Sequence, residues 1–167
     1  MRIGIISDTH GYFDPEVTNY FKDCDEIWHA GDVGDPIVIE HLRRIAPVHC
    51  VYGNIDEGPS RPQLWPEIKW IQHQGVRIMM MHIVGKPLKY LPRVKSLIKR
   101  ESPTILVAGH SHILKVQYDT ENRLLFINPG AAGHHGFHKI RTIIRFEILN
   151  GKPQNMEVIE LGLRGRN

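Results

Sequence analysis

The first ten residues, MRIGIISDTH (residues 1–10), join a short apolar run to polar residues, and this pattern returns along the chain. The run Ile3–Ile6 contains no polar side chain, and such an uninterrupted apolar run is typical of a strand that is buried on both faces. Asp8 and His10 follow where such a strand would end. The segment therefore predicts a buried strand with polar side chains at its carboxyl end.

The same form, an apolar run that leads into polar residues, occurs at four later places in the chain. The runs and the residues after them are Glu26–His29 before Gly31-Asp32, Val48–Tyr52 before Gly53-Asn54, Arg77–Met81 before His82, and Thr104–Ala108 before Gly109-His110-Ser111-His112. In an open α/β sheet, a ligand site lies beyond the carboxyl ends of the strands. We therefore expect all these polar residues to meet at one edge.

Three segments with helical spacing lie between the runs, namely Pro15–Lys22, Pro36–Ile45 and Leu88–Arg100. Pro15 and Pro36 each follow an aspartate, which is typical of a capped helix with proline in its first turn. Strands and helices in alternation predict parallel strands joined by right-handed crossovers.

From residue 113 the chain reads as consecutive strands separated by turn residues. They are Ile113–Tyr118, Leu124–Asn128, Thr142–Leu149 and Met156–Leu161, and Ile68–Gln72 could form a hairpin with Arg77–Met81. We expect an α/β fold in which a second, more antiparallel sheet packs on the first and helices cover the outer faces. One domain is expected to span residues 1–167.

Composition and charge limit the classes of protein to which the chain can belong. Apolar residues make up 41% and charged residues 23%, which is ordinary for a globular protein. The net charge of +3 suits an anionic substrate, but no basic stripe with aromatics supports stable nucleic-acid binding. No apolar stretch reaches the roughly 20 residues of a membrane span. Cys24 and Cys50 form no disulfide framework, so we expect a cytoplasmic protein without membrane association.

Seven residues at the five strand ends form a set of metal ligands without a thiolate. They are Asp8, His10, Asp32, Asn54, His82, His110 and His112. Carboxylates, imidazoles and an amide oxygen suit divalent ions such as manganese, iron, cobalt, nickel or zinc. Seven ligands exceed what one zinc usually takes, so the set predicts two ions with one bridging carboxylate. Two such ions can activate water and stabilise an in-line displacement at phosphorus, so hydrolysis of a phosphate ester is the reaction that fits best.

These blocks, in this order, resemble the five motif blocks of the calcineurin-like metallophosphoesterases. The chain is similar to the compact YfcE-type phosphodiesterases, a group that includes the retromer subunit Vps29. The resemblance extends to Asn128-Pro129-Gly130, which follows the last histidine block. It implies a four-layer αββα sandwich of two mixed sheets flanked by helices, with the metal site at the sheet edge.

The resemblance also implies what each ligand does. A metal-bridging hydroxide would attack phosphorus, and Asp32, Asn54 and His110 count as catalytic residues through that hydroxide and through orientation of the phosphate. Manganese is the expected metal, with nickel, zinc, iron or cobalt as alternatives, and small phosphodiesters are the expected substrates. The implied assignment is one metal on Asp8, His10 and His112, the other on Asn54, His82 and His110, with Asp32 as the bridge.

The chain departs from larger members of the family at Ile55, where they carry a histidine that protonates the leaving group or binds phosphate. Isoleucine cannot donate a proton, and general acid catalysis is worth roughly 10²–10⁴ in rate. The glycine-rich segment 130–138 carries three histidines, and we expect one of them, His138, to contact the substrate phosphate. The competing hypothesis is that all three are solvated loop residues.

Two functional hypotheses follow, an enzyme and a Vps29-like non-catalytic scaffold whose fold serves as a protein-binding surface. The Vps29 branch has lost part of its histidine set, whereas this chain keeps all seven ligand positions, which favours the enzyme. Either form could be a homo-oligomer. Asp56 is expected either to orient Asn54 or a histidine, or to shape a turn. The remaining histidines are expected to be hydrogen-bonded structural residues: His29, His41, His49 and His73.

Overall fold

The computed structural model describes residues 1–56 and 65–165 of the chain. Its helices are α1 (Glu16–Phe21), α2 (Ile37–Arg43), the 3₁₀ helix η1 (Asn54–Asp56) and α3 (Pro92–Glu101). Its strands are β1 (Arg2–Ile6), β2 (Glu26–His29), β3 (Val48–Cys50), β4 (Ile68–His73), β5 (Val76–Met81), β6 (Gly85–Lys86), β7 (Lys89–Tyr90), β8 (Ile105–Val107), β9 (Leu114–Asp119), β10 (Leu124–Pro129), β11 (Ile140–Leu149) and β12 (Lys152–Leu163). Within the described ranges, no helix is long and apolar enough to cross a membrane.

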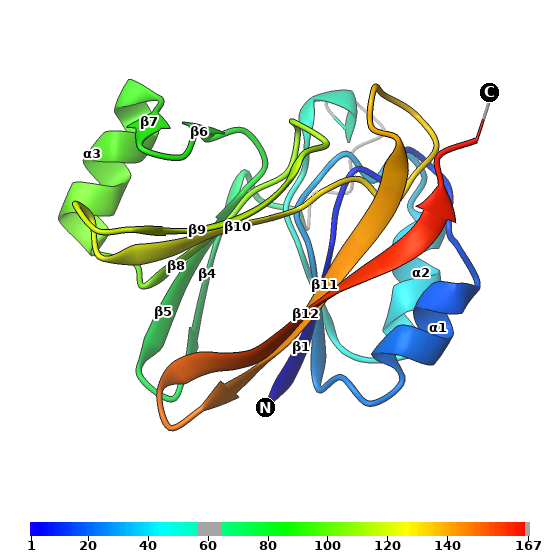
Figure 1. Cartoon of the computed structure of the whole chain (residues 1–167), viewed down its shortest axis with the longest axis horizontal. Coiled ribbons are helices and arrows are strands. Elements are labelled where there is room, and N and C mark those ends of the chain that lie inside the picture. Colours follow the sequence, from blue (N-terminus) through cyan, green and yellow to red (C-terminus); the bar gives the residue numbers. More distant parts are fainter. Residues whose placement is uncertain (57–64, 166–167) are drawn as a thin grey trace.

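Two five-stranded mixed sheets pack face to face (Figure 1). The first sheet has the order β12-β11-β1-β2-β3. β1, β2 and β3 pair in parallel, and β11 pairs antiparallel with both β1 and β12. The second has the order β4-β5-β8-β10-β9, with a parallel centre and an antiparallel strand at each edge. The predicted αββα sandwich of two mixed sheets is therefore confirmed.

The division of the strands between the sheets differs from the expectation of one parallel and one antiparallel sheet. The five strands with polar ends split into β1, β2 and β3 in one sheet and β5 and β8 in the other. The later strands split as well, because β11 and β12 extend the first sheet and β9 and β10 extend the second. Both sheet centres are buried on two faces, so a continuous apolar run does not indicate to which sheet a strand belongs.

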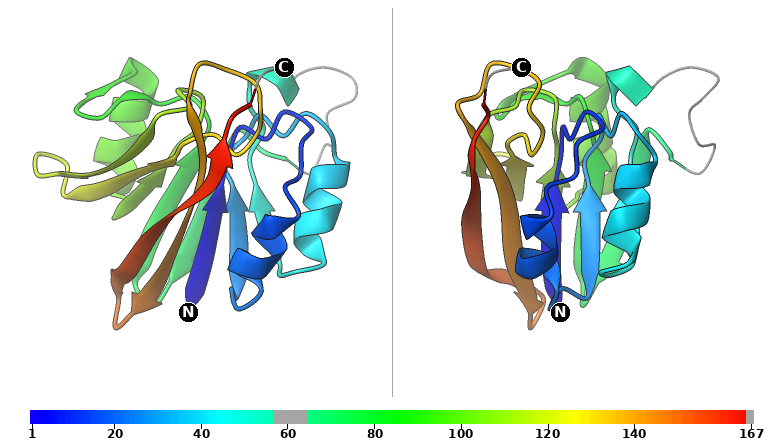
Figure 2. Two further views of the ribbon diagram at one scale, coloured as in Figure 1. Left: turned by 45° about the vertical axis from the view of Figure 1, so that its right-hand side comes forward. Right: turned by 90° about the vertical axis from the view of Figure 1, so that its right-hand side faces the viewer.

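The helices cover the outer faces, with α1 and α2 on the first sheet and α3 on the second (Figures 1 and 2). Asp14 and Asp35 lie two residues before the first two helices, and their carboxylates accept the backbone N–H groups of Glu16 and Ile37 at 3.0 and 2.9 Å. The third helix begins at Pro92, so the predicted start at Leu88 was wrong. A short β6–β7 hairpin occupies residues 85–90, and proline is best accommodated in a first turn.

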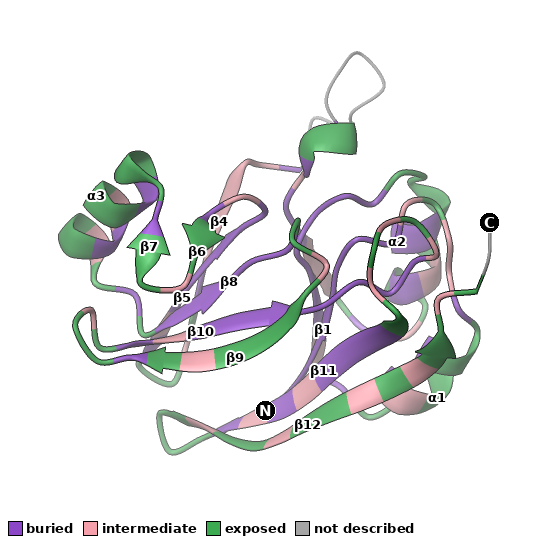
Figure 3. Cartoon of the chain, turned by 45° about the horizontal axis from the view of Figure 1, so that its top comes forward, coloured by how far each residue is buried: buried purple, intermediate pink, exposed green. Residues whose placement is uncertain are grey.

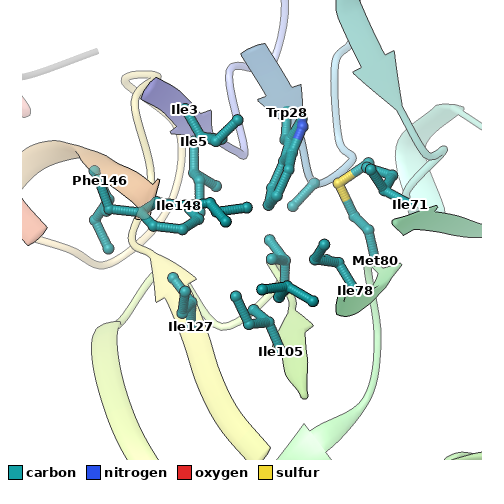
Figure 4. Packing of buried hydrophobic residues seen from close by; sticks show 14 of the residues in the cluster. Ile3, Ile5, Trp28, Ile71, Ile78, Met80, Ile105, Ile127, Phe146 and Ile148 are labelled. Carbon is teal, nitrogen blue, oxygen red and sulfur yellow. The ribbon is translucent and has the colours of Figure 1, made fainter. Parts of the chain in front are cut away.

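The main core lies between the two sheets. Trp28 and Ile5 of the first sheet meet Ile71, Met80 and others of the second, all buried among apolar side chains (Figure 4). Separate apolar clusters lie beneath α1 and α2 and beneath α3. The edge strands β9 and β12 are largely exposed, whereas β1, β5 and β8 are buried (Figure 3). This burial holds the central strands rigidly, and their carboxyl ends present the candidate site.

Candidate metal centre

The loops that follow the strands β1, β2, β3, β5 and β8 bring the predicted ligands together at one edge of the sandwich. Backbone hydrogen bonds join these loops: Asp8 donates to Gly31, His10 to Asp32, and Gly109 to His82, at 3.0 to 3.1 Å. Two groups of metal-ligating atoms result, one formed by Asp8, His10, Asp32 and His112 and the other by Asp32, His82 and His110.

The first group contains two carboxylates and two imidazoles. His112 Nε2 lies 3.1 Å from Asp8 Oδ1, and His10 Nε2 lies 3.8 Å from Asp32 Oδ2. The two Nε2 atoms of His10 and His112 are 3.4 Å apart. Asp8 is fully buried, and its carboxylate also accepts the backbone N–H of His110 at 3.2 Å. These atoms can surround one divalent ion.

The second group shares Asp32 with the first. His82 Nε2 lies 3.3 Å from Asp32 Oδ1 and 4.0 Å from Asp8 Oδ1. His110 contributes through its ring, and its Nδ1 is 2.9 Å from Asn54 Oδ1. The structure thus places six of the seven predicted ligands in two adjacent groups with Asp32 common to both. The seventh, Asn54, lies beside His110 of the second group.

His82 provides the test of whether a cation fits here. Its Nδ1 must carry the proton, because it is 2.7 Å from the carbonyl oxygen of Ala30, which only accepts. In the neutral ring, Nε2 then carries a lone pair. This atom is buried without a hydrogen-bond partner and lies beside the carboxylate of Asp32. Two electron-rich atoms at this distance repel each other unless a proton or a metal ion lies between them. The donor set therefore fits a divalent cation.

Burial and neighbouring charges shift the pKa values of three candidate ligands. Burial works against charge on His82, but the Asp32 contact and the carboxylate of Asp8 outweigh it and raise the pKa of His82. Burial likewise works against the Asp32 carboxylate, yet His82 and the N–H of Ile55 lower the pKa of Asp32. For His10, burial dominates and lowers its pKa, which keeps the ring neutral and available as a ligand.

Five of the seven candidate ligands have a left-handed backbone conformation, which residues other than glycine rarely adopt. The φ angles are 54° at Asp8, 49° at His10, 53° at Asp32, 69° at His110 and 57° at His112. Strain of this kind is concentrated at functional sites, where surrounding structure holds it in place. Here the sharp turn after each strand points successive side chains toward a common centre.

Two residues close to the ligands hold the loops in place. Asp56, at the end of η1, accepts the backbone N–H groups of Val33, Gly34 and Gly53 at 3.1, 2.9 and 2.8 Å. Asp56 thus joins two ligand-bearing loops through their backbone N–H groups. Asn128 donates to the carbonyl of Gly109 at 2.7 Å and so positions the loop that carries His110.

Gly53 is required for the close approach of two loops. A Cβ atom at this position would lie 2.1 Å from Asp32 Oδ1 and 2.3 Å from the Asp32 backbone nitrogen. Because backbone atoms cannot move aside without displacing the loop, any side chain at residue 53 would shift Asp32. The glycine before Asn54 therefore protects the position of the shared ligand.

The glycine-rich loop lies over the ligands but does not direct all its histidines toward them. His138 Nε2 donates to the carbonyl of Gly133 at 3.0 Å, and its ring packs edge-on against His112. His135 instead lines the cleft in front of the ligands and packs on His10, with ring centroids 4.8 Å apart. Three histidines in one loop gave the signal for this contact, but the sequence did not indicate which of them reaches the cleft.

Ile55 and Phe137 form apolar walls of this cleft. Ile55 is 45% exposed and Phe137 is fully exposed, so both side chains can contact a bound molecule. The cleft therefore combines a polar floor, where the candidate ligands lie, with apolar sides. This arrangement suits a phosphate ester with an apolar or aromatic substituent.

Comparison with known proteins identifies relatives of the chain. Residues 1–151 match the sequence model of the calcineurin-like phosphoesterase superfamily domain. A probable metallophosphoesterase from Methanothermobacter thermautotrophicus is 29% identical over 136 residues, which cover 78% of this chain and 77% of that protein. All seven candidate ligand positions lie within the residues that the family model covers.

Solved structures share the fold at lower sequence identity. An archaeal phosphodiesterase superposes with a TM-score of 0.74 at 21% identity, over 96% of this chain and 100% of that one. Wild-type Vps29 from Entamoeba histolytica in complex with Zn²⁺ superposes with a TM-score of 0.69 at 20% identity, over 96% and 99% of the two chains. At these identities the likeness shows the fold alone.

Proposed function

The chain belongs to the calcineurin-like phosphoesterase superfamily, and we propose that it is a metal-dependent phosphodiesterase that hydrolyses small phosphodiesters. The observation that carries the proposal is the pair of ligand groups that share Asp32. An arrangement of carboxylates and imidazoles with one common carboxylate supports a dinuclear centre. Manganese suits the oxygen-rich part of the set, with nickel, zinc, iron or cobalt as alternatives.

The chain's own residues would hold the metals and orient the substrate. Bound divalent ions would supply an activated water and neutralise charge on the phosphoryl oxygens. Asp32 is the proposed bridge, and the N–H of Ile55, 3.0 Å from its Oδ1, fixes the carboxylate. Asn54 and His110 lie together at the cleft and would orient the phosphate.

The leaving group needs a proton donor other than residue 55, which is isoleucine. His135 lines the cleft, and we propose that it contacts the phosphate or the leaving group. The sequence predicts His138 for that contact, although His138 Nε2 forms a hydrogen bond with the carbonyl oxygen of Gly133. Without a positioned acid, good leaving groups such as phenolates would react fastest.

The test is hydrolysis of an aryl phosphodiester by metal-stripped protein to which Mn²⁺, Ni²⁺, Zn²⁺ or Mg²⁺ is returned. We expect turnover that depends on the metal and falls by at least roughly 10²-fold in His110→Ala, because orientation and charge stabilisation are lost. The matched control is His41→Ala, since His41 stacks on Phe13 away from the ligands and should leave turnover unchanged.

The same assay separates the remaining hypotheses. A loss of turnover in His135→Ala but not in His138→Ala would assign the phosphate contact to His135, and the reverse would assign it to His138. If folded protein that binds the ions showed no turnover with any metal, this result would contradict the proposal that the chain is an enzyme. That result would favour a protein-binding scaffold, the second candidate, which the shared fold with Vps29 supports.

A further inference from the structure

A second cluster of metal-ligating side chains lies at the opposite end of the strands from the candidate centre. Glu26 is the first residue of β2, whereas Asp32 follows the end of that strand. His73 is the last residue of β4, which runs antiparallel to β5, the strand that leads into His82. His49 of β3 completes the cluster, so its members come from both sheets.

The three side chains converge on one carboxylate oxygen. Glu26 Oε2 lies 3.2 Å from His49 Nε2 and 3.0 Å from His73 Nε2. The ligand atoms of all three residues lie within 4.8 Å of one another. A tetrahedral zinc ion with bonds of ~2.0–2.1 Å holds its ligands ~3.4 Å apart, so only small movements would admit an ion.

The surroundings orient the cluster and leave it accessible. Trp28 Nε1 donates to Glu26 Oε2 at 3.0 Å, and its ring stacks on His73 with an interplanar angle of 11°. The side chains of His49 and His73 are 28% and 22% exposed, so an ion and a water ligand can enter from solvent. Trp28 itself belongs to the apolar core between the sheets (Figure 4).

The chemistry of the cluster also suits a cation. Glu26 offers carboxylate oxygens, and its Oε2 is held in place by the N–H of Trp28. Each imidazole can offer the Nε2 lone pair when its proton resides on Nδ1.

We propose that Glu26, His49 and His73 form a third metal site, which takes one zinc ion and links β2 and β3 of one sheet to β4 of the other. Two imidazoles and one glutamate are a common set of protein ligands for zinc, with water in the fourth position. The site is independent of the proposed phosphodiesterase activity, because it shares no residue with the candidate centre.

The experiment measures zinc bound per chain after metal-stripped protein is dialysed against Zn²⁺. We expect His73→Gln to bind one zinc ion per chain fewer than the wild type. His41→Gln is the matched control, because it removes one histidine outside both clusters and should leave the zinc content unchanged. Equal zinc content in His73→Gln and the wild type would overturn the proposal.

A second measurement needs no variant and decides the question if His73→Gln does not fold. Wild-type crystals soaked in Zn²⁺ are measured on both sides of the zinc absorption edge. The proposal requires an anomalous peak among Glu26 Oε2, His49 Nε2 and His73 Nε2. A map with zinc at the candidate centre but none among these three atoms would show that the cluster is only a hydrogen-bonded network.

Discussion

At the scale of single residues, the candidate centre depends on groups that bind no metal themselves. Asp56 accepts three backbone N–H groups from two loops, those that carry Asp32 and Asn54. Asp56 is only 9% exposed, so water cannot readily replace these bonds. Sequence reasoning placed Asp56 near the site, but it could not identify the partners, because backbone donors leave no signature in the sequence.

We predict that Asp56→Asn lowers the free energy of unfolding by about 2 kcal/mol, because an amide has one acceptor oxygen and its NH₂ group would face a backbone donor. Urea denaturation in the presence of EDTA measures the loss without a contribution from metal. Asp35→Asn is the control, since Asp35 Oδ1 accepts the N–H of Ile37 in an exposed turn. Equal stability of the two variants would contradict the role given to Asp56.

At the scale of elements, the strand ends were predicted well and the connections less well. The runs before Asp8, Asp32 and His82 are strands β1, β2 and β5, as expected from their continuous apolar character. The β6–β7 hairpin before α3 was missed, because Leu88 and its neighbours also fit helical spacing. Nor did the sequence indicate the left-handed turns after the strands, since aspartate and histidine adopt other conformations in most places.

The left-handed φ of 57° at His112 gives a prediction that separates backbone strain from loss of the ligand. Both His112→Gly and His112→Ala remove the imidazole, but only glycine adopts this conformation freely. We expect His112→Gly to be more stable than His112→Ala by about 1 kcal/mol, as measured by urea denaturation with EDTA.

Asn54 is the matched control for His112, because it is a candidate ligand in a 3₁₀ helix and its φ is not positive. Glycine has no steric advantage there and loses more conformational freedom on folding. The order should therefore reverse, with Asn54→Ala more stable than Asn54→Gly. If the alanine variant were the more stable one at both positions, the left-handed turn at His112 would store no strain.

At the scale of the whole molecule, the common edge for the candidate ligands was predictable, whereas the architecture that forms this edge was only partly predictable. The order of the motif blocks indicated a common edge, yet the blocks come from two sheets rather than one. Asp8 and Asp32 follow strands of the first sheet, whereas His82 and His110 follow strands of the second. Pairing between distant strands such as β1 and β11 depends on packing that short-range patterns do not encode.

Because the candidate ligands come from both sheets, metal binding at this edge should stabilise the whole sandwich. An ion that binds only the folded chain adds about 2.7 kcal/mol at a concentration of 100 times its Kd. For a domain of this size, that corresponds to a rise in Tm of about 5–10 °C for each bound ion. We therefore predict that Mn²⁺ raises the Tm of EDTA-treated protein, as measured by calorimetry.

Two variants locate the origin of that stabilisation. Asp32→Asn removes the charge of the carboxylate shared by both ligand groups, so Mn²⁺ should raise its Tm by less than half as much as in the wild type. His73→Gln should keep the full rise, because His73 belongs to the cluster at the opposite end and its ligand set favours zinc over manganese. If Mn²⁺ stabilised Asp32→Asn as much as the wild type, the ion would bind elsewhere and the two sheets would not be linked through Asp32.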